Sequence, residues 1–366
     1  MFFCMLTLLA IFVPMIGMQE ECDAHSLLLS KVVQSYALDK EISNKDGGRT
    51  HSLDYDATHN RLFAATTGGI VGWNCHDYML CFSNKELKKA TFLIVDSDTL
   101  YCAAQKPRTG IYAVDIPTNT YKQLSEMFTD VMAYDKVKKV LYAGKERAIE
   151  KIDMLNTTGC EEWPIDLGAA IGVTSVTSLC HNNKDNTLYV GLSCGYVQLR
   201  DCAASGACLK TLDLRLWSIK SLICDSQLDE VYIRKCPTDK PQLFQCNSAL
   251  NNEKPIHYPY KIGSFAQDSA SKLLCMRSGP KNIVHIVDPN NTCSRVTTLL
   301  DNSEVFTEFP IACDSQRSIF YAGGYEKISV LKPYIPFASI SLDFHQNAYL
   351  IFKHFVMFRS DLFDFM

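Results

Sequence analysis

The sequence contains one motif that is typical of nucleophilic catalysis. Gly191-Leu192-Ser193-Cys194-Gly195 has the spacing G-x-S-x-G, which in hydrolases exposes a serine on a sharp turn between a strand and a helix. Here the motif follows the apolar pair Tyr189-Val190 and precedes another strand-like segment. This context predicts a hairpin turn flanked by glycines, so we assign no catalytic residue and predict a protein that is not an enzyme.

Residues that could bind a metal ion are present, but their spacing is not that of a known site. The nine histidines include no H-x-x-x-H pair, and the cysteines include no C-x-x-C pair. Calcium requires hard oxygen ligands, and the polar residues near the starts of the first strands, His51, Asp54, Thr129 and Asp130, do not form a ring of carboxylates. We therefore predict no metal and no other cofactor.

Cysteine usage indicates an oxidising compartment, because 16 cysteines are many for a reduced protein. Hairpin geometry gives three candidate disulfides: Cys75 with Cys81, Cys202 with Cys208, and Cys236 with Cys246. Connectivity does not follow from sequence alone, so these pairs are hypotheses. Cys224 and Cys313 each precede an aspartate in a predicted strand, and we interpret them as buried thiols.

The N-terminus predicts secretion. Residues 2–13 form an uncharged apolar run, and the first charges are Glu20 and Glu21. This layout is typical of a signal peptide cleaved near Gly17. A signal anchor is the alternative, although the run is shorter than the roughly 20 apolar residues of a spanning helix. Two sequons, at Asn156 and Asn290, are candidate glycosylation sites and agree with an extracellular protein.

A repeated unit organises most of the chain. An acidic or amide residue opens a polar turn, and an apolar segment with an aromatic residue follows, about every 43 residues. The residues that open the seven turns are Asp56, Asp96, Asp135, Asn182, Asp225, Asp268 and Asp314. Their side chains can accept hydrogen bonds from backbone N–H groups two residues later, so we interpret them as structural turn residues. In the second unit the distance from Asp96 to the aromatic residue Tyr101 is two residues shorter than in the others.

Each unit contains the strands of a propeller blade. A third apolar strand follows each core, as in residues 111–115 and 283–288, and a shorter fourth segment closes most units. Four strands in about 43 residues predict an all-β fold, a β-propeller of seven four-stranded blades. A ring of six blades is the alternative. The last unit lacks a fourth strand, which we expect Val32–Leu38 to supply by closing the ring from the N-terminus.

The repeat resembles the YVTN, NHL and YWTD kinds of propeller repeat, in which a D…LY core precedes an I…D strand. The resemblance covers roughly residues 51–332. No Trp-Asp pair closes a unit, so a WD40 repeat is a poor match. The resemblance implies the fold and a broad habit of binding proteins, peptides, sugars or small molecules.

These observations divide the chain into three parts. We assign residues 1–17 to the signal peptide, 30–333 to the propeller with repeat units from about residue 51, and 334–366 to an apolar C-terminal tail. The tail is too short and too charged to cross a bilayer, and it either packs on the propeller, lacks structure or reflects a mispredicted gene end.

Two functional hypotheses remain. The first is a secreted, non-enzymatic binding module for an extracellular protein, glycan or small ligand. The second, by analogy with calcium-dependent propeller enzymes, is a lactonase or esterase with calcium on the propeller axis. The formal charge of −4 comes from 36 basic and 40 acidic residues that are well mixed, which argues against a nucleic-acid partner. No membrane span is expected.

Overall fold

The computed structural model describes residues 35–45, 47–156, 160–165, 167, 174–203, 205–214, 218–236, 242–258, 261–278, 283–289, 291–299 and 309–334. Nearly all of them belong to one compact unit, Tyr36–Pro333. The predicted signal peptide and the tail beyond Tyr334 lie outside the described residues. No helix in the described ranges is long and apolar enough to cross a membrane.

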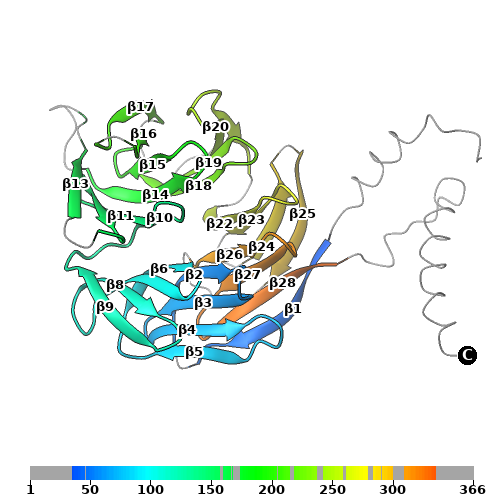
Figure 1. The fold of residues 1–366 in the computed structure, drawn as a ribbon. Coiled ribbons are helices and arrows are strands. Elements are labelled where there is room, and N and C mark those ends of the chain that lie inside the picture. Colours follow the sequence, from blue (N-terminus) through cyan, green and yellow to red (C-terminus); the bar gives the residue numbers. More distant parts are fainter. Residues whose placement is uncertain are drawn as a thin grey trace, which may run out of the picture. The chain divides into compact units, whose positions relative to one another are not determined.

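The described strands form seven four-stranded antiparallel sheets, which are the blades of a β-propeller (Figure 1). This confirms the predicted fold and excludes the six-bladed alternative. Blades 1 to 3 contain β2 Thr50–Asp56, β3 Arg61–Thr66, β4 Gly69–Asn74, β5 Leu80–Asn84; β6 Ala90–Asp96, β7 Thr99–Ala104, β8 Gly110–Asp115, β9 Thr120–Ser125; β10 Met132–Asp135, β11 Val140–Lys145, β12 Ala148–Asp153 and β13 Cys160–Pro164.

The remaining blades follow the same order of strands. Blades 4 to 6 contain β14 Val176–Asn182, β15 Thr187–Leu192, β16 Tyr196–Asp201, β17 Cys208–Asp213; β18 Ile219–Asp225, β19 Glu230–Lys235, β20 Leu243–Asn247, β21 Lys254–Ile256; β22 Ile262–Asp268, β23 Leu273–Ser278, β24 Ile283–Asp288 and β25 Asn291–Leu299. Blade 7 contains β26 Ile311–Asp314, β27 Ile319–Gly323, β28 Lys327–Tyr334 and β1 Ser35–Ser43.

The ring is closed by the N-terminal strand, as the sequence predicts. β1 lies beside β28 as the fourth strand of blade 7 (Figure 1). Its described part, Ser35–Ser43, overlaps the predicted segment Val32–Leu38 from Ser35 onward and runs through the charged residues after it. These charges pair across the two strands, because Lys332 lies 2.8 Å from Asp39 and Lys327 lies 2.8 Å from Glu41. The polar strand β1 can therefore occupy the edge of blade 7, because its charged side chains form ion pairs with β28.

The turn between the first two strands is built by the residue that opens it. The Asp135 carboxylate accepts hydrogen bonds from the N–H groups of Val137, at 2.9 Å, and Lys138, at 3.0 Å. The turn ends four residues after Asp135, at Lys139, whose φ of 56° lies in the left-handed region. Side-chain acceptors occupy the same position at Asp56, Asn182, Asp225, Asp268 and Asp314. This geometry fixes the length of the turn and hence the register of the two strands.

Blade 2 departs from this rule because its turn is shorter. Asp96 and Thr99 face each other at the end of the hairpin, and Ser97 adopts a left-handed φ of 55°. The Asp96 carboxylate is instead directed at blade 3, where it accepts hydrogen bonds from Tyr134 Oη at 2.9 Å and Lys139 Nζ at 2.6 Å.

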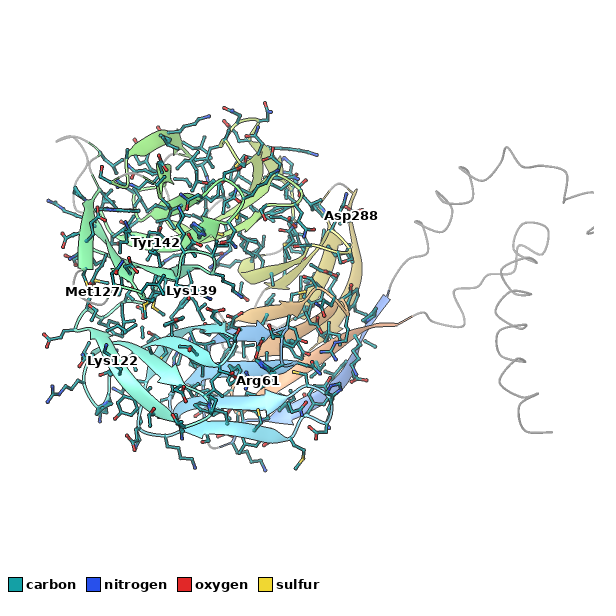
Figure 2. All side chains as sticks on the ribbon, viewed as in Figure 1. Arg61, Lys122, Met127, Lys139, Tyr142 and Asp288 are labelled. Atoms are coloured by element: carbon teal, nitrogen blue, oxygen red, sulfur yellow. The ribbon has the colours of Figure 1, made fainter. Side chains whose placement is uncertain are left out.

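The hydrophobic core lies between neighbouring blades. The buried apolar residues form seven clusters, each drawing its members from two adjacent blades. The aromatic residue of the repeat anchors these layers, and Figure 2 labels one example, Tyr142, which is 1% exposed. Full burial of one such ring contributes about 2–3 kcal/mol, so the repeated aromatic residue helps to join one blade to the next.

Candidate functional site

The site with the clearest construction lies where the two ends of the propeller meet. After β1, the chain hydrogen-bonds blade 7 through Asn44 N–H and Glu326 O, at 2.7 Å. It then bonds blade 1, because Gly68 N–H donates to Gly47 O at 2.9 Å. Asn44 and Gly47, which follow β1, therefore form hydrogen bonds with blade 7 and blade 1, and we call this junction the closure seam.

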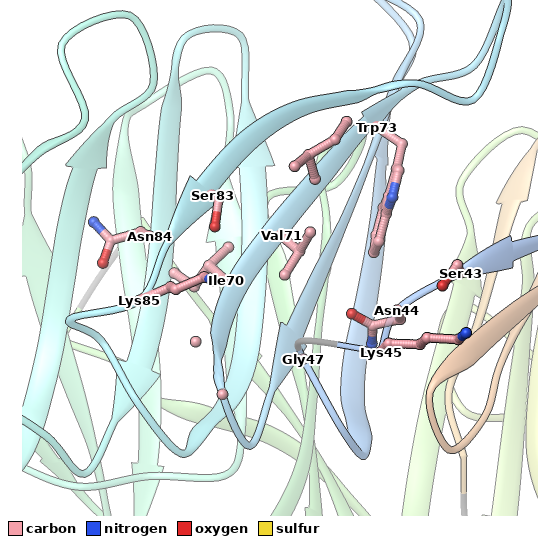
Figure 3. Close-up of a pocket in the computed structure, with 13 residues that line it drawn as sticks. Ser43, Asn44, Lys45, Gly47, Ile70, Val71, Trp73, Ser83, Asn84 and Lys85 are labelled. Atoms are coloured by element: carbon pink, nitrogen blue, oxygen red, sulfur yellow. The ribbon is translucent and has the colours of Figure 1, made fainter.

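A cleft of about 250 Å³ opens at the closure seam. One wall is the end of β1 and the residues after it, and the other is formed by β4 and β5 of blade 1 (Figure 3). Its lining residues are Ser43, Asn44, Lys45, Gly47, Gly68, Gly69, Ile70, Val71, Trp73, Leu80, Ser83, Asn84 and Lys85. The cleft therefore lies between β1, the fourth strand of blade 7, and strands β4 and β5 of blade 1, and all its lining residues fall between positions 43 and 85.

Asn44 contributes a buried acceptor to this cleft. The side chain is 3% exposed, and its Nδ2 lies 3.4 Å from both Gly48 O and Thr50 Oγ1. Its Oδ1 accepts no hydrogen bond within the described residues. A Cβ at position 47 would overlap this oxygen, so any larger residue there would displace the Asn44 amide. Because an unsatisfied buried acceptor costs about 1–3 kcal/mol, Oδ1 is suited to receive a donor from a ligand or a water molecule.

The rim of the cleft combines positive charge with apolar surface. Lys45 and Lys85 are exposed on opposite walls (Figure 3). Leu80, which lines the cleft, is 60% exposed, and the neighbouring Met79 is 65% exposed. Such a rim can receive a segment that carries both a carboxylate and an apolar side chain.

The residues considered as calcium ligands make other contacts. Asp54 Oδ2 accepts a hydrogen bond from the Val95 N–H of blade 2 at 2.8 Å, and burial raises the pKa of this carboxyl. His51 Nε2 lies 3.2 Å from Thr67 Oγ1, and burial lowers the pKa of the imidazole. Within the described ranges, no group of three or more His, Cys, Asp or Glu side chains is arranged to hold a metal ion.

The G-x-S-x-G motif forms a hairpin turn between β15 and β16, in agreement with the sequence analysis. Ser193 Oγ accepts a hydrogen bond from the Ser175 N–H at 2.9 Å. Gly191 packs where a Cβ would overlap the side chain of Ile219 in blade 5. The glycine thus allows close packing of two blades.

The candidate disulfide cysteines are free thiols in the structure. Cys75 and Cys202 are buried, and burial raises the pKa of each thiol to about 11, whereas Cys81 and Cys208 are exposed. The pairs Cys75–Cys81 and Cys202–Cys208 stay predictions.

The register of blade 5 does not bring Cys236 and Cys246 together. Cys246 faces Val231 across the β19–β20 ladder, whereas Cys236 lies five residues beyond Val231, after the end of β19. At about 3.3 Å per residue, this offset exceeds the Cα separation of a disulfide. Both residues belong to the hairpin that the sequence predicts, but the register of its two strands keeps them apart.

One of the two sequons can be located. Asn156 is exposed after β12, and its Nδ2 donates to Asp153 Oδ2 at 3.0 Å. Asn290 lies outside the described residues. Glycosylation of both remains a prediction.

Comparison with known proteins identifies the fold and not a family. No protein-family model matches the sequence, and no curated protein matches it. Among solved structures, a chain of the mitotic checkpoint complex matches with a TM-score of 0.65 and 16% identity, over 81% of this protein and 92% of that chain. Raptor from Chaetomium thermophilum matches with a TM-score of 0.66 and 15% identity, over 85% of this protein and 30% of Raptor.

These structural neighbours are of the WD40 type, and in Raptor the match is to part of the chain. The protein therefore shares their fold although its repeats lack the Trp-Asp pair. At these identities the likeness establishes the seven-bladed propeller alone. The closer resemblance to YVTN, NHL or YWTD repeats is not confirmed.

Proposed function

We propose that the protein is a non-enzymatic binding module that captures a polypeptide partner at the closure seam. The observation that carries this proposal is the cleft in which the buried acceptor of Asn44 lies between an exposed apolar rim and two lysines. A propeller fold is commonly an interaction module, and the two structural neighbours, a chain of a checkpoint complex and Raptor, share that fold.

The size of the cleft favours a segment of a larger partner over a small molecule or a glycan. Pockets that enclose a ligand of drug size usually hold about 300–1,000 Å³. The seam cleft, at about 250 Å³, falls below that range, and its rim continues into the exposed side chains of Met79 and Leu80. Met79 and Leu80 can pack against the surface of a protein partner, while the cleft receives one anchoring residue of that partner.

We also propose that the protein acts outside the cell. The apolar run at residues 2–13, the 16 cysteines and the sequon at the exposed Asn156 support this proposal. Expression of the full chain in a secretory cell line tests it. Secretion into the medium with a mass lowered by glycosidase treatment supports the proposal, and retention of an unmodified chain inside the cell contradicts it.

Binding is tested with a seam variant and a matched control. Met79→Glu combined with Lys45→Glu reverses the charge of the rim and removes an apolar anchor, and both side chains are exposed. The control is Val137→Glu, which changes a 78% exposed apolar residue on the turn of blade 3. Partners are first captured on the native protein from extracellular fluid, and the affinity of each purified partner is then measured for all three proteins.

The proposal predicts that the seam variant weakens the partner at least tenfold while the control binds like the native protein. This loss corresponds to about 1.4 kcal/mol or more. A partner that binds the seam variant with native affinity would contradict the seam as its site. Turnover of a lactone or ester by the native protein would contradict the non-enzymatic role.

A further inference from the structure

Two cysteines from neighbouring blades are in contact. Cys180 belongs to β14 of blade 4, and Cys224 belongs to β18 of blade 5. The Cys224 N–H donates to Cys180 Sγ at 3.2 Å, and the Cys224 thiol donates to the carbonyl oxygen of His181 at 3.5 Å. Each sulfur therefore lies against the backbone of the neighbouring blade at the junction of blades 4 and 5.

The backbone around this contact is compatible with a covalent bond. Disulfides join Cα atoms that are roughly 4.4–6.8 Å apart. A 3.2 Å contact between the sulfur of one residue and the backbone nitrogen of the other holds the two Cα atoms at about that separation. Both residues are half-buried, unlike the fully buried Cys275.

We propose that Cys180 and Cys224 are a redox modification site, at which oxidation forms a disulfide that joins blade 4 to blade 5. The oxidant is a low-molecular-weight disulfide such as oxidised glutathione. Neither cysteine lines the cleft at the closure seam, so this modification is independent of the partner proposed there.

The reaction is two successive thiol–disulfide exchanges. The Cys180 thiolate attacks one sulfur of the small disulfide, whose S–S bond breaks and releases one small thiolate. The Cys224 thiolate then attacks the Cys180 sulfur and releases the second. In total, two protein thiols lose two protons and two electrons, and one small disulfide is reduced to two thiols.

The local contacts decide which thiol reacts first. The hydrogen bonds from Cys224 hold the pKa of the Cys180 thiol below its usual value. The same contact raises the pKa of Cys224. Cys180 is therefore the attacking thiolate, and Cys224 is the resolving residue.

Blades 6 and 7 supply a natural comparison. Cys275 and Cys313 pack in the same interblade cluster, and burial raises the pKa of each thiol. Cys275 is 0% exposed, so a small disulfide does not reach it. Proximity between blades is common to both pairs, whereas partial exposure of both residues and a thiol with a lowered pKa are found only in the pair Cys180 and Cys224.

The test is carried out on the reduced full chain in a Cys160→Ser background. This background is needed because trypsin, which cuts after Lys151 and Lys184, leaves Cys160 and Cys180 in one peptide, whereas cuts after Lys220 and Arg234 isolate Cys224. The protein is titrated with oxidised glutathione, the remaining thiols are alkylated, and the digest is analysed by mass spectrometry without reduction.

The expected product is a cross-linked peptide pair that contains Cys180 and Cys224. Cys224→Ser should instead trap glutathione on Cys180, whereas Cys180→Ser should leave Cys224 alkylated. Cys313→Ser, the control, should form the cross-link at the same oxidant concentration as the parent. If both thiols are recovered alkylated when the exposed Cys81 and Cys208 are fully glutathionylated, or if either one joins a different cysteine, the proposal is overturned.

Discussion

The hydroxyl of Tyr134 lies 2.9 Å from Oδ2 of Asp96 in the preceding blade. The two tyrosine rings at this junction, Tyr134 and Tyr101, have centroids 4.8 Å apart. Lys139 donates to the same carboxylate oxygen at 2.6 Å. Equivalent residues stack at other junctions: Tyr55 on Tyr321 at 5.8 Å and His181 on Tyr142 at 5.8 Å. The residue before the turn in one blade thus packs against the aromatic residue of the blade before it.

This junction predicts the effect of removing one hydroxyl. Tyr134→Phe keeps the ring contact but removes a hydrogen bond to a carboxylate that is 14% exposed. Because hydrogen bonds to charged groups contribute about 1.5–3 kcal/mol, we expect a loss of stability in that range, measured by urea denaturation. Tyr101→Phe is the control, since its hydroxyl contacts only that of Tyr134, at 3.3 Å, and it should lose less. Equal losses in the two variants would show that Asp96 does not matter to the junction.

The turn residues predict a difference between amide and alanine replacements. Asp225 Oδ1 accepts hydrogen bonds from the N–H groups of Gln227 and Leu228, at 2.9 and 3.1 Å, while its Oδ2 is buried without a hydrogen-bond partner. Asp225→Ala should cost about 1–3 kcal/mol because two N–H groups lose their acceptor. Asp225→Asn keeps the acceptor, as Asn182 does naturally in blade 4, and should cost less than half as much. Thermal unfolding of the two variants checks this order, and an equal loss would contradict it.

The propeller could be predicted from the sequence because its information is local and repeated. An Asp or Asn at the turn recurs in each unit, an aromatic residue in the next strand recurs in all units but the sixth, where Cys275 replaces it, and both have direct structural roles at Asp135 and Tyr142. The bounds of the closing strand were harder to predict, since Asp39, Lys40 and Glu41 resemble a polar loop until their partners on β28 are known.

The closure seam could not be predicted, because its residues form no recognisable sequence motif. Asn44, Gly69 and Ser83 are ordinary turn and edge residues, and the cleft that they line is formed by the folded arrangement of β1 beside blade 1. The contact between Cys180 and Cys224 did leave a signal. Their separation of 44 residues is about one repeat, so the two fall at nearly the same position of adjacent blades.

Buried His285 predicts a dependence of stability on pH. The side chain is in β24, is 2% exposed and meets the Tyr258 ring edge-on at 5.4 Å. Burial lowers its pKa to about 4, from about 6.5 in the unfolded chain. Between these values the unfolded chain binds more protons than the folded one, so this contribution to stability is complete above about pH 6.5 and is lost as the pH falls toward 4.

His285→Gln should therefore lose less stability than the native protein between pH 7 and pH 5, as followed by the urea midpoint at each pH. Exposed His76 supplies the control, and His76→Gln should retain the native pH dependence. Parallel pH profiles for the native protein and the His285 variant would exclude His285 as the source of acid sensitivity.

The disulfide proposed between Cys180 and Cys224 has its own consequence for stability. It would close a loop of 44 residues, for which the chain-entropy model gives up to about 4 kcal/mol. We expect the oxidised protein to unfold several degrees above the reduced one and dithiothreitol to abolish the difference. Cys224→Ala should unfold at one temperature under both conditions, whereas Cys313→Ser should keep the redox-dependent shift. If the oxidised native protein, with the cross-link verified by mass spectrometry, unfolds at or below the temperature of the reduced form, the bond strains the junction of blades 4 and 5 instead of stabilising it.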